Sequence, residues 1–260
     1  MHHASFTRAI VRPPERNFVE GLTTAGLGVP DLSVALGQHE AYCRALERCG
    51  LALTRLAPDP VYPDSTFVED TAIITRRGAI LTRPGAASRA GEVAAIRPAL
   101  TAFFAEFREI TAPGTVDGGD ICEAGEHYFI GISARTNEAG ARQLADFLTA
   151  SGFTSSPVDI RGISSILHLK SGLTWLGGKR LIVIDALANH AAFRGYEIMR
   201  VATAEEYAAN CIRVNEFVLL PAGFPKLQAA LEASGDRVIP LEMSEFWKLD
   251  GGLSCLSLRF

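Results

Sequence analysis

A cysteine near the end of the printed sequence has the surroundings of a nucleophile. The last residues read DGGLSCLSLRF, so Cys255 follows a glycine pair that permits a sharp turn or a close approach of the backbone to a ligand. If this segment is a strand, alternation places Cys255 on the face shared with Ser257 and Arg259, away from the leucines. A single cysteine is more often a small buried apolar side chain. The glycines and the preceding Asp250 favour a reactive thiol here.

A thiol nucleophile needs a neighbouring group that moves protons, and histidine is the usual one. Of the six histidines, five lie at the N-terminus, in polar helical or loop segments, or at a hairpin turn, where a solvated side chain is expected. His168 differs, because SSILHLKSG places it between leucines on a predicted buried strand. It is either a satisfied core residue or a catalytic one.

Carboxylates form the third group of candidates. PDSTFVEDTA carries Asp64, Glu69 and Asp70, and GTVDGGD carries Asp117 and Asp120 around two glycines. Aspartate and glycine also favour turns through local hydrogen bonding, which is the plainer interpretation. If Glu69 and Asp70 enter a strand, their side chains point to opposite faces, so one of them faces inward. An inward carboxylate requires a cationic partner.

Composition limits the class of protein that positions these groups. The chain has 260 residues, 48% of them hydrophobic, and a formal net charge of −4, which predicts a globular protein with a large core. It contains no run of basic residues, which argues against nucleic acid or an anionic membrane as a partner and favours a small molecule. Five scattered cysteines without CxxC spacing predict neither a disulfide framework nor a structural zinc site. With no signal-peptide or transmembrane pattern, we predict a cytoplasmic protein.

The order of predicted elements repeats along the chain as strand, strand, helix, strand. Hairpins are predicted at 71–83, 120–133, 166–185 and 210–223, and helical patterns follow the first, second and fourth of them. If Asp70, Asp120 and His168 are equivalent, the spacings are 120 − 70 = 50 and 168 − 120 = 48, within the range of repeat arrays. The terminal strand GLSCLSLRF could be completed by SFTRAIVRP, which would close a ring. We therefore predict an α/β protein with one domain over residues 1–260. The loop between Pro13 and Pro30 is predicted to be plain surface or a lid.

Seven segments in order resemble the dimethylarginine dimethylaminohydrolase family. They are FVED (67–70), TRPGAASR (82–89), TVDGGD (115–120), SARTN (133–137), LHLK (167–170), NCIRVNE (210–216) and the terminal DGGLSCLSLRF (250–260). Each string alone is weak, but together they cover essentially the whole chain. The resemblance implies the pentein fold, a β/α-propeller of five pseudo-symmetric ββαβ units around a central tunnel.

The resemblance also implies roles for individual residues. Cys255 would be the nucleophile, His168 the general acid and base, and Asp117, which is glutamate in some relatives, would orient the histidine. The implied substrate contacts are Asp70 and Glu69 for the guanidinium, Arg89 and Arg135 for the carboxylate, Asp64 with carbonyls near Leu22 and Leu249 for the ammonium, and Phe67 and Asp250 beside them. These pairings are physically coherent, because a permanently charged guanidinium needs carboxylates and a carboxylate suits arginine. No metal or other cofactor is implied, and the protein would be a monomer or a homodimer.

The implied reaction is hydrolysis of Nω-methylated arginines to citrulline through a covalent cysteine thiouronium. Arginine deiminase, which shares the fold, is the alternative. Deiminases are longer and have an aspartate two residues after the histidine, where this chain has Lys170. If that position faces the site, a lysine cannot bind an unmethylated nitrogen, which favours methylated substrates. Amidinotransferases are longer too, and a noncatalytic pentein-like binding factor would not need both Cys255 and His168.

Overall fold

Five three-stranded sheets make up the architecture. The structure is a computed structural model, and it describes residues 5–260. The sheets are β15 (Leu258–Arg259) with β1 (Arg8–Val11) and β2 (Ala52–Arg55); β3 (Ala72–Thr75), β4 (Gly78–Leu81) and β5 (Phe107–Glu109); β6 (Ile121–Ala124), β7 (His127–Ile132) and β8 (Thr154–Asp159); β9 (Leu173–Gly177), β10 (Arg180–Ile184) and β11 (Glu197–Val201); and β12 (Ile212–Val214), β13 (Phe217–Pro221) and β14 (Arg237–Leu241).

The same pairing recurs in every sheet. The first strand runs antiparallel to the middle one, and the third runs parallel to it. A parallel pair needs a crossover between its strands. Four units provide it with an α-helix: α1 (Leu32–Arg48), α2 (Glu92–Thr101), α3 (Glu138–Ala150) and α4 (Pro225–Ala233). The β9–β11 unit differs, because its crossover contains only the 3-10 helix η6 (Ala191–Phe193).

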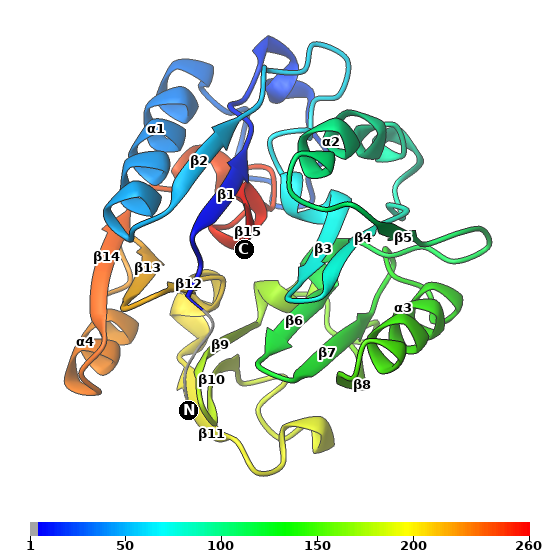
Figure 1. Cartoon of the computed structure of the whole chain (residues 1–260). Helices are drawn as coiled ribbons and strands as arrows, with labels where there is room; N and C mark the ends of the chain where they lie inside the picture. The colour runs from blue at the N-terminus through cyan, green and yellow to red at the C-terminus, as the bar shows by residue number, and fades with distance from the viewer. Residues whose placement is uncertain (1–4) are drawn as a thin grey trace.

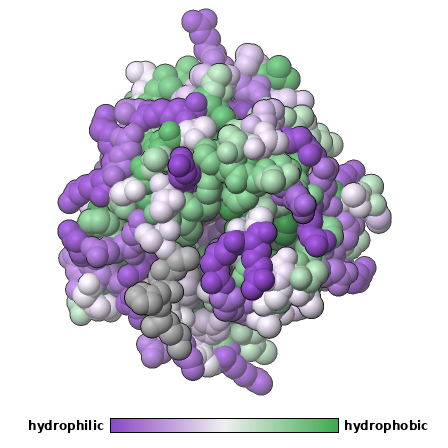
Figure 2. Space-filling model, in the orientation of Figure 1, coloured by the Kyte–Doolittle hydropathy of each residue, from purple (hydrophilic) through white to green (hydrophobic). Residues whose placement is uncertain are grey.

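The five sheets stand around a common axis, with the four long helices on the outside of the ring (Figure 1). Apolar side chains of the strands pack against the helices in four buried clusters. Two of these helices start at an N-cap residue: the side chain of Asp31 accepts the N–H of Val34, and that of Asn137 accepts the N–H of Gly140. On the face seen in Figure 2, hydrophilic residues lie around much of the margin and just below the middle, and apolar ones lie nearer the upper middle. Within residues 5–260, no helix has the length and apolarity needed to cross a membrane.

The predicted pentein architecture is confirmed, including closure of the ring. β15 pairs antiparallel with β1, with Ala9 opposite Arg259. The predicted terminal strand is wrong in its extent, because only Leu258–Arg259 is a strand and Cys255 lies in a 3-10 turn before it. The predicted equivalence of His168 with Asp120 is also wrong. His168 and Asp117 both occupy the cap position before a 3-10 turn, so these two correspond.

Candidate active site

Short 3-10 turns at the start of each unit bring the site residues together. They are η2 (Val68–Thr71), η4 (Gly118–Asp120), η5 (Leu169–Ser171), η7 (Thr203–Ala209) and η8 (Ser254–Leu256), with α5 (Ser244–Trp247) shortly before the last. Each turn precedes the first strand of its sheet. The turns η2 and η8 are in contact, and the contacts continue from η2 to η4, η5 and η7 in order. The turns therefore form an arc around the axis of the ring.

Three buried side chains join one unit to the next at this level. In each case a side-chain oxygen at the end of one turn accepts a backbone N–H of the following turn. The pairs are Asp70 with Gly119 at 2.8 Å, Asp120 with Leu169 at 3.0 Å, and Asn210 with Ser254 at 2.9 Å. Such bonds satisfy backbone donors that a one-turn helix leaves unpaired. They also hold the catalytic candidates of adjacent units in a set geometry.

A narrow cavity lies among these turns. Its lining consists of Leu22, Asp64, Phe67, Asp70, Arg89, Arg135, Leu167, His168, Leu249, Asp250, Gly251 and Cys255. The residues to which the resemblance gave roles all line the cavity except Asp117 and Glu69. Asp120 and Lys170, which the sequence also singled out, do not line it. Sequence reasoning did not identify Leu167 as a lining residue, although it directly precedes His168.

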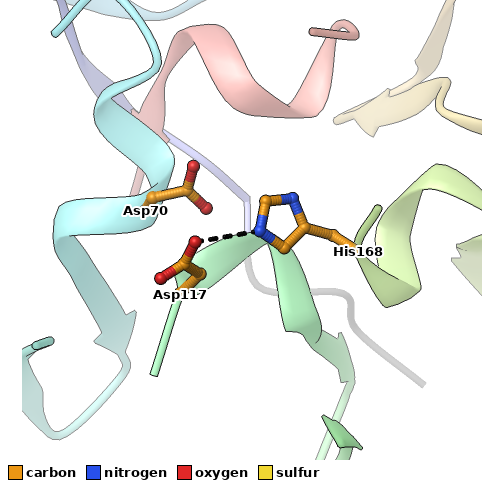
Figure 3. A group of neighbouring side chains, drawn as sticks. All are labelled: Asp70, Asp117 and His168. Atoms are coloured by element: carbon orange, nitrogen blue, oxygen red, sulfur yellow. Dashed lines mark hydrogen bonds and ion pairs between the residues drawn. The ribbon is translucent and has the colours of Figure 1, made fainter. Parts of the chain in front are cut away.

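His168 is held by a carboxylate from the neighbouring unit. Its Nε2 donates to Asp117 Oδ2 at 3.0 Å, and Asp117 is fully buried (Figure 3). The other oxygen of Asp117 accepts the N–H of Gly85 at 2.8 Å, which sets the orientation of the carboxylate. Burial lowers the pKa of the ring, but the charge of Asp70 and the bond to Asp117 outweigh it and raise the pKa to about 9. His168 is therefore a proton donor at neutral pH.

Asp70 connects the histidine to an arginine. Its carboxylate accepts the N–H of Gly119 and pairs with Arg89 Nη1 at 2.5 Å. Burial would raise the pKa of Asp70, but the facing His168 and Arg89 lower it to about 2. Asp70, Asp117 and His168 place ligand atoms within 4.8 Å of one another, a spacing that could hold a metal ion. The hydrogen bond to Asp117 and the ion pair to Arg89 already engage these atoms.

Arg89 is largely occupied by the protein itself. Its Nε and Nη2 donate to the carboxylate of Glu92, and Nη2 also reaches the carbonyl oxygens of Phe67 and Asp64. Burial raises the pKa of Glu92 to about 7 against the influence of Arg89. Sequence reasoning missed Glu92, although its i,i+3 spacing from Arg89 was a usable signal. The Arg135 guanidinium also lines the cavity and has no hydrogen bond or ion pair within residues 5–260.

Cys255 lies in η8, in surroundings that keep its thiol protonated. The N–H of Gly252 points at Sγ, 3.4 Å away. Burial raises the pKa of the thiol well above its usual value, and the charges of Glu69 and Asp70 raise it further. Close packing explains the glycine pair: a Cβ on Gly251 would lie 2.3 Å from the Phe67 ring, and one on Gly252 would lie 2.4 Å from Asn210.

Glu69 and Lys170 face each other beneath the cavity. Glu69 belongs to the 3-10 turn η2, so the predicted strand alternation with Asp70 is wrong and both side chains are buried. Its carboxylate pairs with Lys170 Nζ at 2.6 Å and accepts the Ser254 hydroxyl at 2.8 Å. Lys170 lies in η5 rather than on a strand, and it does not line the cavity.

The loop between Pro13 and Pro30 closes one side of the cavity. The N–H of Leu22 donates to Asp64 Oδ1 at 3.0 Å. Asp250, which has a positive φ of 58°, accepts both the N–H and the hydroxyl of Thr24. The left-handed conformation is unfavourable for a non-glycine residue. The loop is thus fastened at two points to residues that line the site.

Comparisons with known proteins agree with this geometry. Residues 43–217 match the family model described as arginine deiminase. The chain is 45% identical to N(G),N(G)-dimethylarginine dimethylaminohydrolase of Pseudomonas aeruginosa, over 98% of its own length and 100% of the relative. It is 33% identical to a Streptomyces coelicolor protein of the same name, over 97% of this chain and 96% of the relative. A solved structure of the P. aeruginosa protein, a cysteine-to-serine variant complexed with citrulline, has a TM-score of 0.96 at 44% identity and covers 99% of this chain and 100% of that one.

Proposed function

Because the chain belongs to the dimethylarginine dimethylaminohydrolase family, we propose that it hydrolyses Nω-methylated arginines to citrulline and methylamine or dimethylamine. The observation that carries the proposal is the composition of the cavity wall. A cysteine and a carboxylate-held histidine lie in the same wall as Asp64 and Arg135, which can receive an amino acid backbone. This set offers a group for every charged part of a methylated arginine.

Charge determines how the substrate is oriented. The guanidinium faces Asp70, which stays ionised because its pKa is lowered to about 2. The α-carboxylate binds Arg135, whose guanidinium N–H groups have no partner within residues 5–260. Arg89, which is bonded to Asp70, adds positive charge to the site. Arginine suits this task because its planar fork can donate two parallel hydrogen bonds to a carboxylate. Asp64 and nearby backbone carbonyls receive the ammonium.

Substrate binding activates the thiol. Glu69 and Asp70 disfavour a thiolate in the empty cavity, and a bound guanidinium cation opposes both charges and lowers the pKa of Cys255. The thiol gives its proton to solvent, and the thiolate forms a bond to the guanidinium carbon. His168 gives its proton to the departing amine as the C–N bond breaks, which leaves a thiouronium on Cys255. The neutral His168 next takes a proton from water, and the hydroxide adds to the same carbon. The C–S bond then breaks as the hydroxyl proton of the adduct passes to the sulfur, which releases citrulline and the thiol.

Arginine deiminase chemistry is the second candidate, since the matching family model carries that name. It differs only in the nitrogen that is expelled. Lys170 stands where the resemblance places the deiminase aspartate, and it is paired with Glu69. No carboxylate is therefore supplied at that position to hold an unmethylated nitrogen. Lys170 does not line the cavity, so the preference for methylated arginines rests on the relatives, whose name is dimethylarginine dimethylaminohydrolase.

The test is citrulline release from asymmetric dimethylarginine, monomethylarginine and arginine side by side. We expect turnover of both methylated substrates and poor turnover of arginine, because an unpaired buried donor costs roughly 1–3 kcal/mol, or about ten- to a hundredfold. Cys255→Ser should abolish turnover, and Cys49→Ser, a buried thiol outside the cavity, should retain most of it. Equal kcat/KM for arginine and dimethylarginine would instead establish a deiminase.

Partners and compartment complete the proposal. The ligand is a small arginine derivative, and neither nucleic acid nor a membrane surface has a part in it. All five cysteines are free thiols, which supports a reducing, cytoplasmic setting. We propose a single domain that acts as a monomer or a homodimer without a cofactor.

A further inference from the structure

A second, larger cleft of about 460 Å³ adjoins the catalytic cavity. It is lined by Thr24, Ser164, Ser165, Ile166, Leu167, Ser171, Thr203, Ala204, Glu206, Tyr207, Asn210, Phe224, Trp247, Asp250 and Gly252. Leu167 and Asp250 belong to both linings, so the two spaces share a wall. The cleft is large enough for a small organic molecule.

The cleft borders the end of the catalytic cavity where the C–N bond breaks. Its lining includes Gly252, whose N–H points at the Cys255 thiol, and Leu167, which precedes His168. It includes neither Arg135 nor Asp64, the groups at the amino acid end. Neither catalytic side chain lines the cleft, but a molecule in it contacts Leu167, which adjoins His168, and Gly252, which contacts Cys255.

Aromatic rings form one wall of the cleft. Tyr207 and Trp247 stack with centroids 4.2 Å apart and an interplanar angle of 16°. Phe224 lies 5.8 Å from the first ring and 5.9 Å from the second. Trp247 is 38% exposed, unusually open for so large a side chain. Such rings offer negative π faces, which attract organic cations.

The charges of the cleft have one sign. Among the described residues that line it, Glu206 and Asp250 alone carry a formal charge at neutral pH, and none is a lysine, arginine or histidine. Asp250 is partly engaged by Thr24. The half-buried Glu206 carboxylate has neither a hydrogen bond nor an ion pair within the part of the chain that the structure describes. These walls repel carboxylates and phosphates and suit a small alkylated cation.

We propose that this cleft binds the alkylammonium ion released by the reaction, dimethylammonium or methylammonium, on its way from Cys255 to solvent. The inference rests on the proposed function for the source of the amine. The amine leaves with the proton of His168 and takes a second proton from solvent, because aliphatic amines are cationic at neutral pH. The methyl groups of the resulting ion fit the aromatic wall. Glu206 supplies the counter-charge.

Binding is measured directly through Trp247. The chain has two tryptophans, so a Trp175→Phe background leaves Trp247 as the only indole. Titration of dimethylammonium chloride, with sodium chloride at matched ionic strength as the blank, should give a saturable fluorescence change. Glu206→Gln should weaken it about fivefold, and Glu106→Gln, an exposed carboxylate on another unit, should leave it unaltered. A linear response identical to that of sodium chloride overturns the proposal.

Product inhibition separates this inference from the proposed function. With dimethylarginine as substrate, citrulline should inhibit competitively, and dimethylammonium should inhibit noncompetitively and less strongly in Glu206→Gln. Trp247→Leu provides a second variant, with the same loss expected. Turnover without any saturable amine binding overturns the cleft proposal alone. Amine binding without turnover of any methylated arginine overturns the proposed function and, with it, the role of the cleft as a product site.

Discussion

Replacing Asp117 by asparagine should change the protonation of His168 while preserving the shape of the site. In the native arrangement Nε2 donates to Oδ2 at 3.0 Å and the other oxygen accepts the N–H of Gly85 at 2.8 Å. An asparagine can keep its oxygen on Gly85, but its NH₂ then faces Nε2, which must lose its proton to accept. If the amide is flipped, its oxygen accepts the proton of His168 Nε2, but its NH₂ then faces the N–H of Gly85. In either orientation one of the two native hydrogen bonds, to His168 or to Gly85, is lost.

The size of the effect follows from the bond that is lost. A hydrogen bond to a charged group contributes about 1.5–3 kcal/mol, and one pKa unit corresponds to about 1.36 kcal/mol. The pKa of His168, about 9 in the native protein, should therefore fall by roughly one to two units. Asp70 still faces the ring and prevents a larger fall. Because the imidazolium protonates the leaving amine, its protonated fraction at about pH 9, and with it kcat, should fall about 5- to 50-fold.

The assay combines the pH dependence of kcat with an NMR titration of the His168 ring. The alkaline limb of the rate profile and the ring titration should both move to lower pH. Asp146→Asn, which removes an exposed carboxylate of α3, is the matched control and should change neither. An Asp117→Asn protein whose His168 titrates at the native pH would refute the reasoning, because the hydrogen bond would then have no electrostatic role.

Three further perturbations have definite outcomes. Gly119→Ala should lower kcat at least about tenfold with little change in circular dichroism. The added Cβ would lie 2.8 Å from Cγ of His168 and 3.0 Å from an oxygen of Asp70. A native kcat would contradict the close packing. Lys170→Asp should lower Tm without improving arginine turnover, because it places a carboxylate against Glu69. Lys170→Met, which adds no negative charge, should lower Tm less. Faster arginine turnover in the aspartate variant would show that this position faces the substrate. The pKa of His168 is raised from 6.5 to about 9, so its contribution to stability is complete below the unfolded value and is lost as pH rises through the folded one. Urea unfolding should thus show a fall in stability between about pH 6 and pH 10 that is smaller in His168→Gln, and an equal fall in both proteins would contradict the assignment.

Much of the fold was predictable because its signals are local and repeated. Three of the four predicted hairpins have glycine at the turn and three are followed by a helical pattern, and β3–β4 and β6–β7 lie where the sequence placed them. A helix follows β4 as predicted, over Glu92–Thr101, with Pro98 inside it.

The turns that carry the site could not be predicted in the same way. A 3-10 helix of three or four residues has no periodicity to detect, so Glu69, Lys170 and Cys255 were placed on strands. The rule that alternate residues share a face then gave Lys170 the wrong surroundings, since its partner is Glu69. Partners such as Asn210, bonded to Ser254 across 44 residues, depend on the closed ring and leave no local signal.

The sheet that joins β15 to β1 gives the protein an order of assembly. The turn bearing Cys255 directly precedes β15, and β15 is held by the first strand of the chain, with Ile10 opposite Leu258. During synthesis, β1 and β2 can pair early, and the edge of β1 that later binds β15 stays unpaired while the other units are made and fold. Contacts between such distant segments form late, because the loop they close is the longest in the protein. The thiol turn is thus set in place by the same event that completes the ring, and a growing or truncated chain carries the binding carboxylates before it carries a positioned nucleophile.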